Sequence, residues 1–495
     1  MDQAQYLNTR LLSLNQQPPA SDGRYVLYWM QQQRRLHYNF AVQHACYRAA
    51  QHQCPLLIIE TLDCNYAWAS DRHHSFAIAG MCDHRQACKG LQVGYFPFIE
   101  EKPGDMAQLM QALAEASCEV VTDDVPCFFV DGNNQLAADW PVRATAVDSN
   151  GILPMRLLEK PCPTAAVFRR HLHKHAAAAL SVFPAANPLT ERPLTRWRDT
   201  LLPPLPQRLG ASHTFLKAWL ASPTQSLAKL PIDHSVAIVP GRGGRRAALR
   251  ECEHFIAEKL SRYGAERSDP VADSASGLSP YLHWGHISSH EILQQVWEHE
   301  ADWDIGRLPE KGGARLGFWP LSESAQRYID ELLTWRELGY HTATLRPDAY
   351  GSYHGLPDWA RLTLAQHSDD PRPYTYTLDE FTRAQTHDEV WNAAMRQLLR
   401  EGIIHNYLRM LWGKKILEWS PGPEIAFEWA LILNNKWSLD GNNPNSFSGV
   451  SWCFGRYDRP WFERDIFGKI RYMSSDSTRR KFPLSSYLER YKSLE

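Results

Sequence analysis

Three tryptophan-rich segments follow one another near the end of this chain: THDEVWNAA (386–394), HNYLRMLWGKKILEW (405–419) and LILNNKWSLDGNNPNSFSGVSW (431–452). Together they have the pattern of a mostly helical region. The part of the chain beyond residue 235 holds 13 of the 18 tryptophans. We expect that part to be almost entirely helical.

Trp412 and Trp419 are seven residues apart. If residues 405–419 form one helix, the two indoles lie on the same side, roughly 10 Å apart along its axis. Trp391 is expected on the preceding helix. A row of indoles leading inward from the surface can pass single electrons to a buried redox cofactor, because each ring can be transiently oxidised. By spacing alone, however, core filling or an interface stripe is the commoner reason for such tryptophans.

A charged residue inside this apolar region favours a functional site. Arg409 directly precedes Met410 and Trp412 in an otherwise apolar run. A buried guanidinium needs a carboxylate or another polar partner. Asp440, in the loop after the next helix, is a candidate for that partner.

Several motifs in the same order resemble the class II photolyases of the photolyase and cryptochrome superfamily. They are THDxxWNAA, RMLWGKKILEW, LDGxxPN, FGKIRYM (467–473), GRYVLYWMQ (23–31) and LSPYLHWGHIS (278–288). The resemblance implies an α/β N-terminal domain with a parallel sheet, linked to an all-helical C-terminal FAD-binding domain. It also implies light-driven DNA repair, in which photoexcited reduced FAD donates an electron that splits cyclobutane pyrimidine dimers. Trp412, Trp391 and Trp419 would then carry electrons to the flavin.

Composition agrees with a large intracellular enzyme. A chain of 495 residues divides into two domains, because single cores rarely exceed about 250 to 300 residues. Apolar runs of about 18 residues and a signal-peptide core are both missing, so we expect a cytoplasmic protein. Ten dispersed cysteines without a CxxC pair indicate reduced thiols. Only Cys252 and Cys453 fall in the C-terminal half, which argues against an iron–sulfur cluster. No metal site is expected, since His171 and His175 lack a third ligand.

The first part of the chain alternates strand and helix patterns. Strands are expected over residues 24–30, 55–60, 90–98 and 119–122, with a helix over 106–116, as in a parallel α/β domain. Residues 185–235 are rich in Pro, Ser and Thr and are expected to form an extended connector. The expected domains are therefore an α/β, antenna-type domain over 1–184 and a helical FAD- and DNA-binding domain over 236–495.

The resemblance assigns the flavin to a set of seven residues. Ser276 and Ser279 are small hydroxyl residues just before a helix, where side chains and free N–H groups can bind an anion. By resemblance, the FAD diphosphate lies there, Arg409 and Asp440 form a salt bridge under the isoalloxazine ring, and Asn434 faces its N5. The full cofactor set is Tyr263, Ser276, Leu278, Ser279, Arg409, Asn434 and Asp440. A second, antenna chromophore is possible, but no motif identifies it.

Glu331 and Trp335 are at i and i+4, so a carboxyl and an indole share one helix face. An aromatic wall can stack on a base extruded from the duplex, while a carboxyl bonds its Watson–Crick edge. A surface ion pair with Arg336 is the alternative for Glu331. The resemblance places Glu331, Trp335, Met410, Trp452 and Asn434 at the catalytic site, with Trp335 and Trp452 flanking the lesion.

The formal net charge of −2 offers no bulk attraction to nucleic acid. Residues 453–494, however, carry ten Lys or Arg against five acidic residues. A local basic surface is sufficient to bind phosphates, although a solvated face with structural ion pairs would have the same composition. We expect a monomer that binds UV-damaged DNA and no membrane, with contacts from Arg456, Arg459, Lys469 and Arg471.

The chain departs from the class II pattern at three places. GHISSHE (285–291) puts Glu291 where a DNA-contacting Arg is expected, and a carboxylate facing phosphate would weaken binding. LDGNNPNSF (439–447) replaces LDGRDPNGY, and Tyr340 and His341 replace an Asp-Asn pair. These changes leave open an alternative function as a photolyase-like blue-light photoreceptor, or as a flavin photoenzyme with a different substrate.

Overall fold

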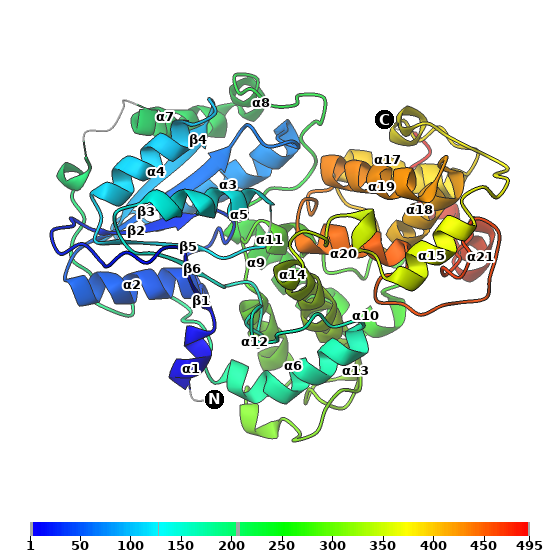
Figure 1. Ribbon diagram of the computed structural model, residues 1–495, viewed down its shortest axis with the longest axis horizontal. Helices are drawn as coiled ribbons and strands as arrows, with labels where there is room; N and C mark the ends of the chain where they lie inside the picture. Colours follow the sequence, from blue (N-terminus) through cyan, green and yellow to red (C-terminus); the bar gives the residue numbers. More distant parts are fainter. Residues whose placement is uncertain (1–2, 127, 204–207, 494–495) are drawn as a thin grey trace. The chain divides into compact units, whose positions relative to one another are not determined.

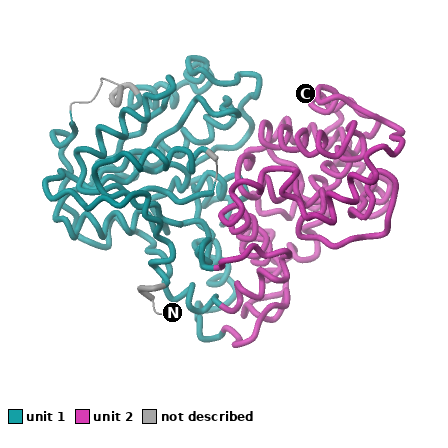
Figure 2. Tube along the Cα trace, viewed as in Figure 1, with its two compact units in different colours: residues 1–157, 175–253, 278–307 teal, residues 158–174, 254–277, 308–495 magenta. Residues whose placement is uncertain are grey.

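The structure is a computed structural model that describes residues 3–126, 128–203 and 208–493 (Figure 1). The chain packs into two units (Figure 2). Unit 1 comprises residues 1–157, 175–253 and 278–307, and unit 2 comprises residues 158–174, 254–277 and 308–495. Helix α6 (Ala165–Leu180) contributes residues to both units.

Unit 1 contains a six-stranded sheet with the order β1-β6-β5-β2-β3-β4. Its strands are β1 (Leu11–Ser13), β2 (Val26–Met30), β3 (Leu56–Asp63), β4 (Gly94–Glu100), β5 (Glu119–Asp123) and β6 (Ala144–Val147). Neighbouring strands are parallel except β1, which pairs antiparallel with β6. The expected parallel α/β sheet is therefore confirmed. Strands β1 and β6 were not predicted, because three or four residues leave too little periodicity to recognise.

The central strand β2 packs against a different core on each face of the sheet, as the pleat of a strand requires. Tyr28 and Met30 pack with α2 (Phe40–His52), whereas Trp29 packs with α4 (Asp105–Glu115). Figure 1 shows these two helices on opposite faces of the sheet. A strand buried on both faces is a continuous apolar run, which is why this strand could be predicted.

The remaining helices of unit 1 are α1 (Gln3–Asn8), α3 (Asp71–Ala87), α5 (Phe128–Asn134), α7 (Arg208–Ala221), α8 (Pro223–Leu227), α9 (Arg245–His254), α11 (Ser279–His283) and α12 (Ser289–Glu300). Helices α7 and α8 lie within residues 185–235, so the expectation of an extended connector is wrong there. Part of that connector, residues 204–207, lies outside the described residues. The domain boundaries at 184 and 235 stay a prediction.

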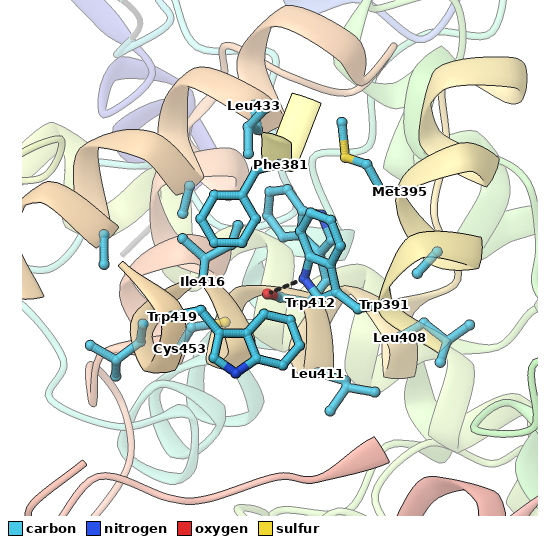
Figure 3. Packing of buried hydrophobic residues seen from close by; sticks show 14 of the residues in the cluster. Phe381, Trp391, Met395, Leu408, Leu411, Trp412, Ile416, Trp419, Leu433 and Cys453 are labelled. Carbon is cyan, nitrogen blue, oxygen red and sulfur yellow. Dashed lines mark hydrogen bonds between the residues drawn. The ribbon is translucent and has the colours of Figure 1, made fainter. Parts of the chain in front are cut away.

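Among the described residues of unit 2, the regular secondary structure is helical, and loops and one isolated bridge between Arg464 and Gly468 connect the helices. Its helices are α10 (Leu260–Glu266), α13 (Glu323–Ile329), α14 (Arg336–Leu345), α15 (Asp358–Gln366), α16 (Leu378–Thr382), α17 (Glu389–Glu401), α18 (Asn406–Trp419), α19 (Pro423–Trp437), α20 (Pro444–Cys453), α21 (Ser475–Lys481) and α22 (Ser485–Arg490). One apolar core joins α15 to α22 and includes Trp391, Trp412 and Trp419 (Figure 3). The helical half predicted from the sequence is confirmed in this unit.

Candidate functional site

The three tryptophans Trp391, Trp412 and Trp419 form one continuous row. Trp391 lies between the other two: its ring centroid is 6.4 Å from Trp412, with the planes 4° apart, and 6.2 Å from Trp419, at 66°. Its indole N–H donates to the Trp412 carbonyl oxygen at 3.1 Å (Figure 3). Asp388 caps α17 by accepting from the Val390 and Trp391 backbone N–H groups, which positions the central indole.

The outer end of this row does not reach the surface. Trp419 is only 2% exposed, as is Trp412, and Trp391 is fully buried. The expected row leading inward from the surface is therefore wrong at its outer end. The rings that contact Trp419 on its far side belong to Tyr376 and His387.

Arg409 and Asp440 form the ion pair that was expected from the sequence. Two guanidinium nitrogens of Arg409, on α18, lie 3.1 and 3.3 Å from the two carboxylate oxygens of Asp440. The turn that carries Asp440 is held by Asn443 and Ser446, whose side chains donate to its main-chain carbonyl at 3.2 and 3.0 Å. Two hydrogen bonds within the protein therefore hold the main chain of this turn.

Asn434, on α19, is buried. Its amide donates to the Asn435 side chain at 3.3 Å and accepts from the Ser438 hydroxyl at 3.4 Å. A Cβ at Gly441 would lie 3.0 Å from the Asn434 carbonyl oxygen, so glycine lets the turn approach the helix. Asn434 is thereby held within the same local framework as Asp440.

Two of the four replaced residues of LDGNNPNSF, Asn442 and Asn443, are explained by this turn. Asn442 adopts a left-handed backbone with φ of 59°, a conformation that Asn tolerates better than most residues. Asn443 caps α20 by accepting from the Asn445 and Ser446 backbone N–H groups. Both asparagines therefore suit the backbone of the turn, although they differ from the Arg and Asp of the family motif.

Two buried donors on α18 have no acceptor among the described residues: Arg409 Nε and Trp412 Nε1. Buried donors are nearly always hydrogen-bonded in folded proteins. Because residues three apart lie on one face of a helix, both donors are available to the same bound group. A planar heteroaromatic ligand with ring nitrogen and carbonyl acceptors, such as a flavin, fits this arrangement.

Glu331 and Trp335 belong to a π-helical turn, Asp330–Trp335, a feature that often marks functional sites. Glu331 forms an ion pair with Arg267, which ends α10. Burial raises the pKa of Glu331, and the Arg267 guanidinium opposes that rise. The alternative of a surface pair with Arg336 is wrong.

Arg336 instead lies 4.6 Å over the Tyr340 ring. Sequence reasoning missed Arg267. Arg267 stands four residues after Tyr263, on the same helical face. Tyr263 is buried against the Phe255 and Tyr328 rings, with centroids 5.7 and 5.3 Å away.

Trp452, on α20, is half-buried between two cations. Lys414 Nζ lies 5.1 Å from its ring centroid and the Arg471 guanidinium carbon lies 5.6 Å away. Lys414 is fully buried, which lowers its pKa to about 8. Arg471 also binds both oxygens of Asp458, at 2.8 and 3.1 Å. Two cations therefore lie against the indole, while Met410 remains partly exposed.

The structure gives less support to the expected diphosphate contacts of Ser276 and Ser279. Ser279 begins α11, a helix of five residues, and no side chain caps it at Leu278. Ser276 belongs to unit 2, whereas Leu278 and Ser279 belong to unit 1. A joint role of these three residues in binding a diphosphate stays a prediction.

The four expected DNA-binding residues differ in exposure. Arg459 and Lys469 are exposed and Arg471 is partly exposed. Arg456 is buried and donates to the Gly355 carbonyl oxygen at 2.7 Å. Because Arg456 is only 5% exposed, its guanidinium does not lie on the surface, where the phosphate contact was expected.

Glu291 does not face solvent, contrary to the expectation from GHISSHE. It is 4% exposed, and its two carboxylate oxygens accept from Arg245 at 2.6 and 2.7 Å. Both residues belong to unit 1. The replaced position therefore forms an internal ion pair and presents no carboxylate to a phosphate. His341 is likewise buried, with a ring nitrogen 3.1 Å from the Lys160 carbonyl oxygen.

At the carboxyl ends of β2 and β5, where the strand order reverses, ligands often bind in α/β sheets. Here Asp123 accepts from the Gln31, Gln32 and Gln33 backbone N–H groups, and the Gln31 amide donates to Thr122. These polar groups are satisfied by the protein itself. They do not indicate which antenna chromophore, if any, unit 1 binds.

Two classes of site find no support in the described residues. Among them, no three or more His, Cys, Asp or Glu are grouped so that they could hold a metal ion. Within residues 3–126, 128–203 and 208–493, no helix is both long and apolar enough to cross a membrane.

Comparison with known proteins finds relatives along the full chain. The chain is 34% identical to the deoxyribodipyrimidine photo-lyase of Methanothermobacter thermautotrophicus, over 98% of each chain. It is 29% identical to that of Potorous tridactylus, over 93% of this chain and 80% of the relative. A crystal structure of a bacterial class III photolyase from Agrobacterium tumefaciens matches with a TM-score of 0.67 and 17% identity, over 95% and 86% of the two chains. No family model matches the chain.

Proposed function

The chain belongs to the deoxyribodipyrimidine photo-lyases, and from that premise we propose which of its residues carry out the light-driven repair of pyrimidine dimers. The identity to the Methanothermobacter relative spans both units. The observation that carries the proposal is the buried row Trp412–Trp391–Trp419, whose first indole and the neighbouring Arg409 on the same helix each have a buried donor without an acceptor among the described residues. That arrangement suits one-electron chemistry at a bound aromatic cofactor.

We propose that the cofactor is FAD, bound on its isoalloxazine side by Arg409, Asn434 and Asp440, with Trp412 as the nearest indole of the row. These four residues are the flavin side of the site. When bound and reduced, FAD would supply the photoexcited electron that opens the dimer. The ion pair keeps Arg409 in one rotamer and presents its free Nε donor, while Asn434 offers an amide that can donate or accept. The diphosphate contacts of Tyr263, Ser276, Leu278 and Ser279 belong to the same proposal.

We propose that Glu331, Trp335, Met410 and Trp452 hold the lesion; these four residues are its lesion side. A pyrimidine dimer extruded from the duplex stacks on indoles and accepts or donates hydrogen bonds at its base edges. Glu331 suits that edge because a carboxyl accepts hydrogen bonds when ionised and donates one when protonated, and burial raises its pKa. Arg267 already pairs with this carboxyl. When the lesion binds, Glu331 therefore either leaves Arg267 or contacts Arg267 and the lesion together.

The partner is UV-damaged DNA, bound through the exposed cations Arg459 and Lys469 and the partly exposed Arg471. Arg471 links the phosphate-binding surface to the lesion side, because its guanidinium also lies near Trp452. Assignment to class II, action as a monomer in the cytoplasm and a second chromophore in unit 1 are part of the proposal. THDEVWNAA, RMLWGKKILEW and FGKIRYM support the class II assignment.

A role as a blue-light photoreceptor has lost its main support. That alternative rested on a carboxylate at Glu291 weakening the binding of DNA. Since Glu291 is buried against Arg245, it exerts no such effect on a bound phosphate. Repair is therefore the function that the site supports best.

The test uses chemically reduced holoprotein and an oligothymidine that carries cyclobutane dimers. Under blue light, the ultraviolet absorbance of thymine should recover, and a dark sample should show no recovery. Trp419→Phe is a matched control, because chemically reduced protein does not need the indole row and should still repair. No recovery from wild-type protein that binds flavin would refute the proposal.

A further inference from the structure

A turn near the end of the chain carries the three cations proposed to bind DNA. This segment, residues 459–471, is the basic turn, and its cations are Arg459, Lys469 and Arg471. At its base, Arg471 pairs with Asp458, with nitrogen–oxygen distances of 2.8 and 3.1 Å. The residues of the turn belong to no helix or strand, so contacts with neighbouring elements must hold its tip.

His367, which follows α15, lies between two carboxylates. Its Nδ1 is 2.6 Å from an Asp370 carboxylate oxygen, and its Nε2 is 3.1 Å from a carboxylate oxygen of Glu463, in the basic turn. An ionised carboxylate only accepts hydrogen bonds, so both ring nitrogens must donate. Only the imidazolium form has two N–H groups. Both bonds can therefore form only when His367 is protonated.

Asp370 also holds the main chain of the basic turn. The carboxylate oxygen that accepts from His367 accepts from the Ile466 backbone N–H at 2.7 Å as well. Ile466 has a left-handed backbone with φ of 67°, which is a strained conformation for a β-branched residue. Such a conformation persists only where surrounding contacts hold it. His367 and Asp370 together therefore hold the tip of the turn in a conformation that a free chain would rarely adopt.

The basic turn lies close to the end of α15. The Lys469 backbone N–H donates to the Thr363 hydroxyl at 3.0 Å. A Cβ at Gly468 would lie 2.2 Å from that hydroxyl oxygen and 2.9 Å from the His367 ring, so a side chain would not fit there. Because Lys469 follows this contact at once, a movement of the turn away from His367 would displace one of the proposed phosphate contacts.

Two carboxylates bind His367, and two cations act on those carboxylates in turn; the four are Asp370, Glu463, Arg372 and Lys469. The hydrogen bonds with Glu463 and then with Asp370 raise the pKa of His367. The bond from His367 lowers the pKa of Glu463. Because the folded-state pKa of His367 exceeds the ordinary value, the imidazolium persists to a higher pH than in an unfolded chain and is lost as pH rises through the raised pKa.

We propose that His367 is a proton-dependent positioning residue that holds the basic turn against α15 for the binding of DNA. The inference rests on the proposed function, which assigns the cations of this turn to DNA phosphates. When the His367 proton passes to solvent, one ring nitrogen has no hydrogen to donate, and the bond with either Glu463 or Asp370 is lost. The surface also loses one positive charge. Both changes weaken the binding of a polyanion.

The test is the affinity of the holoprotein for a dimer-bearing oligothymidine, measured in the dark by fluorescence titration at constant ionic strength over a series of pH values. Wild-type affinity should fall about fivefold as pH rises through the His367 pKa, the size of one partly exposed ion pair. His367→Gln has no proton to lose, so it should bind about fivefold more weakly at the acidic end and show no fall.

Glu463→Gln should move the fall to lower pH, because the bond with Glu463 contributes most to the raised pKa of His367. His354→Gln is the matched control, since His354 pairs with Glu424 at 3.3 Å and neither residue belongs to the basic turn; it should keep the wild-type profile. A pH-independent wild-type affinity, or a fall that survives in His367→Gln, would overturn the inference alone. A wild type that binds the oligothymidine at no pH would overturn the proposed function as well.

A second readout needs no DNA. Exchange of the His367 ring C2 hydrogen for deuterium, followed by mass spectrometry over a series of pH values, measures the pKa of this one imidazole. That pKa should lie above the ordinary histidine value and fall in Glu463→Gln. Backbone amide protection of residues 459–471, corrected for the intrinsic effect of pH on exchange, should drop as His367 loses its proton and stay low in His367→Gln. An unchanged His367 pKa in Glu463→Gln would show that the imidazole–carboxylate bond is not formed.

Discussion

The flavin side and the lesion side of the site are constructed differently. On the flavin side, Asn434 and Asp440 are buried and bonded to neighbouring side chains. On the lesion side, the Glu331 side chain is 29% exposed, and Trp335 and Trp452 are partly exposed. The first set is completed when the chain folds, whereas the second must stay open for a large partner. Breaking the buried contacts of the flavin side should therefore affect the stability of the folded protein, and substitutions on the lesion side should affect mainly binding and repair.

The largest expected effect comes from breaking the flavin-side ion pair. Asp440→Ala leaves the half-buried Arg409 without its carboxylate, which should lower the free energy of unfolding by about 3 kcal/mol and abolish retention of flavin. Asp458→Ala is the matched control, because Asp458 makes a similar two-oxygen pair with the more exposed Arg471. It should keep flavin and lose about 1 kcal/mol. Flavin absorbance per protein and chemical denaturation measure both quantities; equal losses in the two variants would refute the distinction.

The second effect separates electron transfer from substrate binding. Trp412→Phe should retain flavin but reduce light-driven flavin reduction to background, because phenylalanine is far harder to oxidise than indole. Trp452→Phe, on the lesion side, should leave photoreduction intact and weaken binding of damaged DNA. Flash absorption spectroscopy checks the first result. Normal photoreduction in Trp412→Phe would remove that indole from the row.

Substitution of Glu331 tests whether this lesion-side residue contributes to repair without affecting the binding of flavin. Glu331→Gln should lower kcat/KM for repair about tenfold, equivalent to about 1.4 kcal/mol of lost hydrogen bonding in the transition state, and leave flavin content unchanged. Full activity would show that this carboxyl does not contact the lesion.

The raised pKa of Glu331 also predicts a pH effect on stability. Since the folded protein holds the proton to a higher pH than the unfolded chain, stability should fall as pH rises from the unfolded-state pKa through the folded-state pKa. Glu331→Gln should remove that fall, as measured by denaturation over a series of pH values. The same slope in wild type and variant would contradict the assigned environment.

The smallest effect concerns the exposed cations. Arg459→Ala should weaken the binding of all DNA sequences similarly and reduce the slope of log affinity against log salt by about 1, because one phosphate contact is lost. Arg479→Ala is the control, since this arginine is paired with Glu389 and should leave the slope unchanged. A fluorescence titration at several salt concentrations distinguishes the two.

Local sequence patterns were sufficient to predict several of the strands and helices and part of the flavin side. The buried strand Val26–Met30 and the helix over residues 405–419 have periodicities that tertiary packing does not alter. The Arg409–Asp440 pair followed from the need of a guanidinium in an apolar run for a carboxylate. Ion pairs between distant segments were not predictable in this way. Both Glu331–Arg267 and Glu291–Arg245 join residues more than 40 positions apart, and many other arginines were available.

The sequence by itself determined the α/β and helical parts, the three indoles and the charged residue among them, because these depend on spacing within single segments. Only the tertiary structure decided that Trp391 stands between Trp412 and Trp419, that Arg456 is buried, and that the Tyr376 ring lies against Trp419. Exposure and ring contact depend on which helices pack together. That choice minimises the exposed apolar surface of the whole core, and no single segment encodes it.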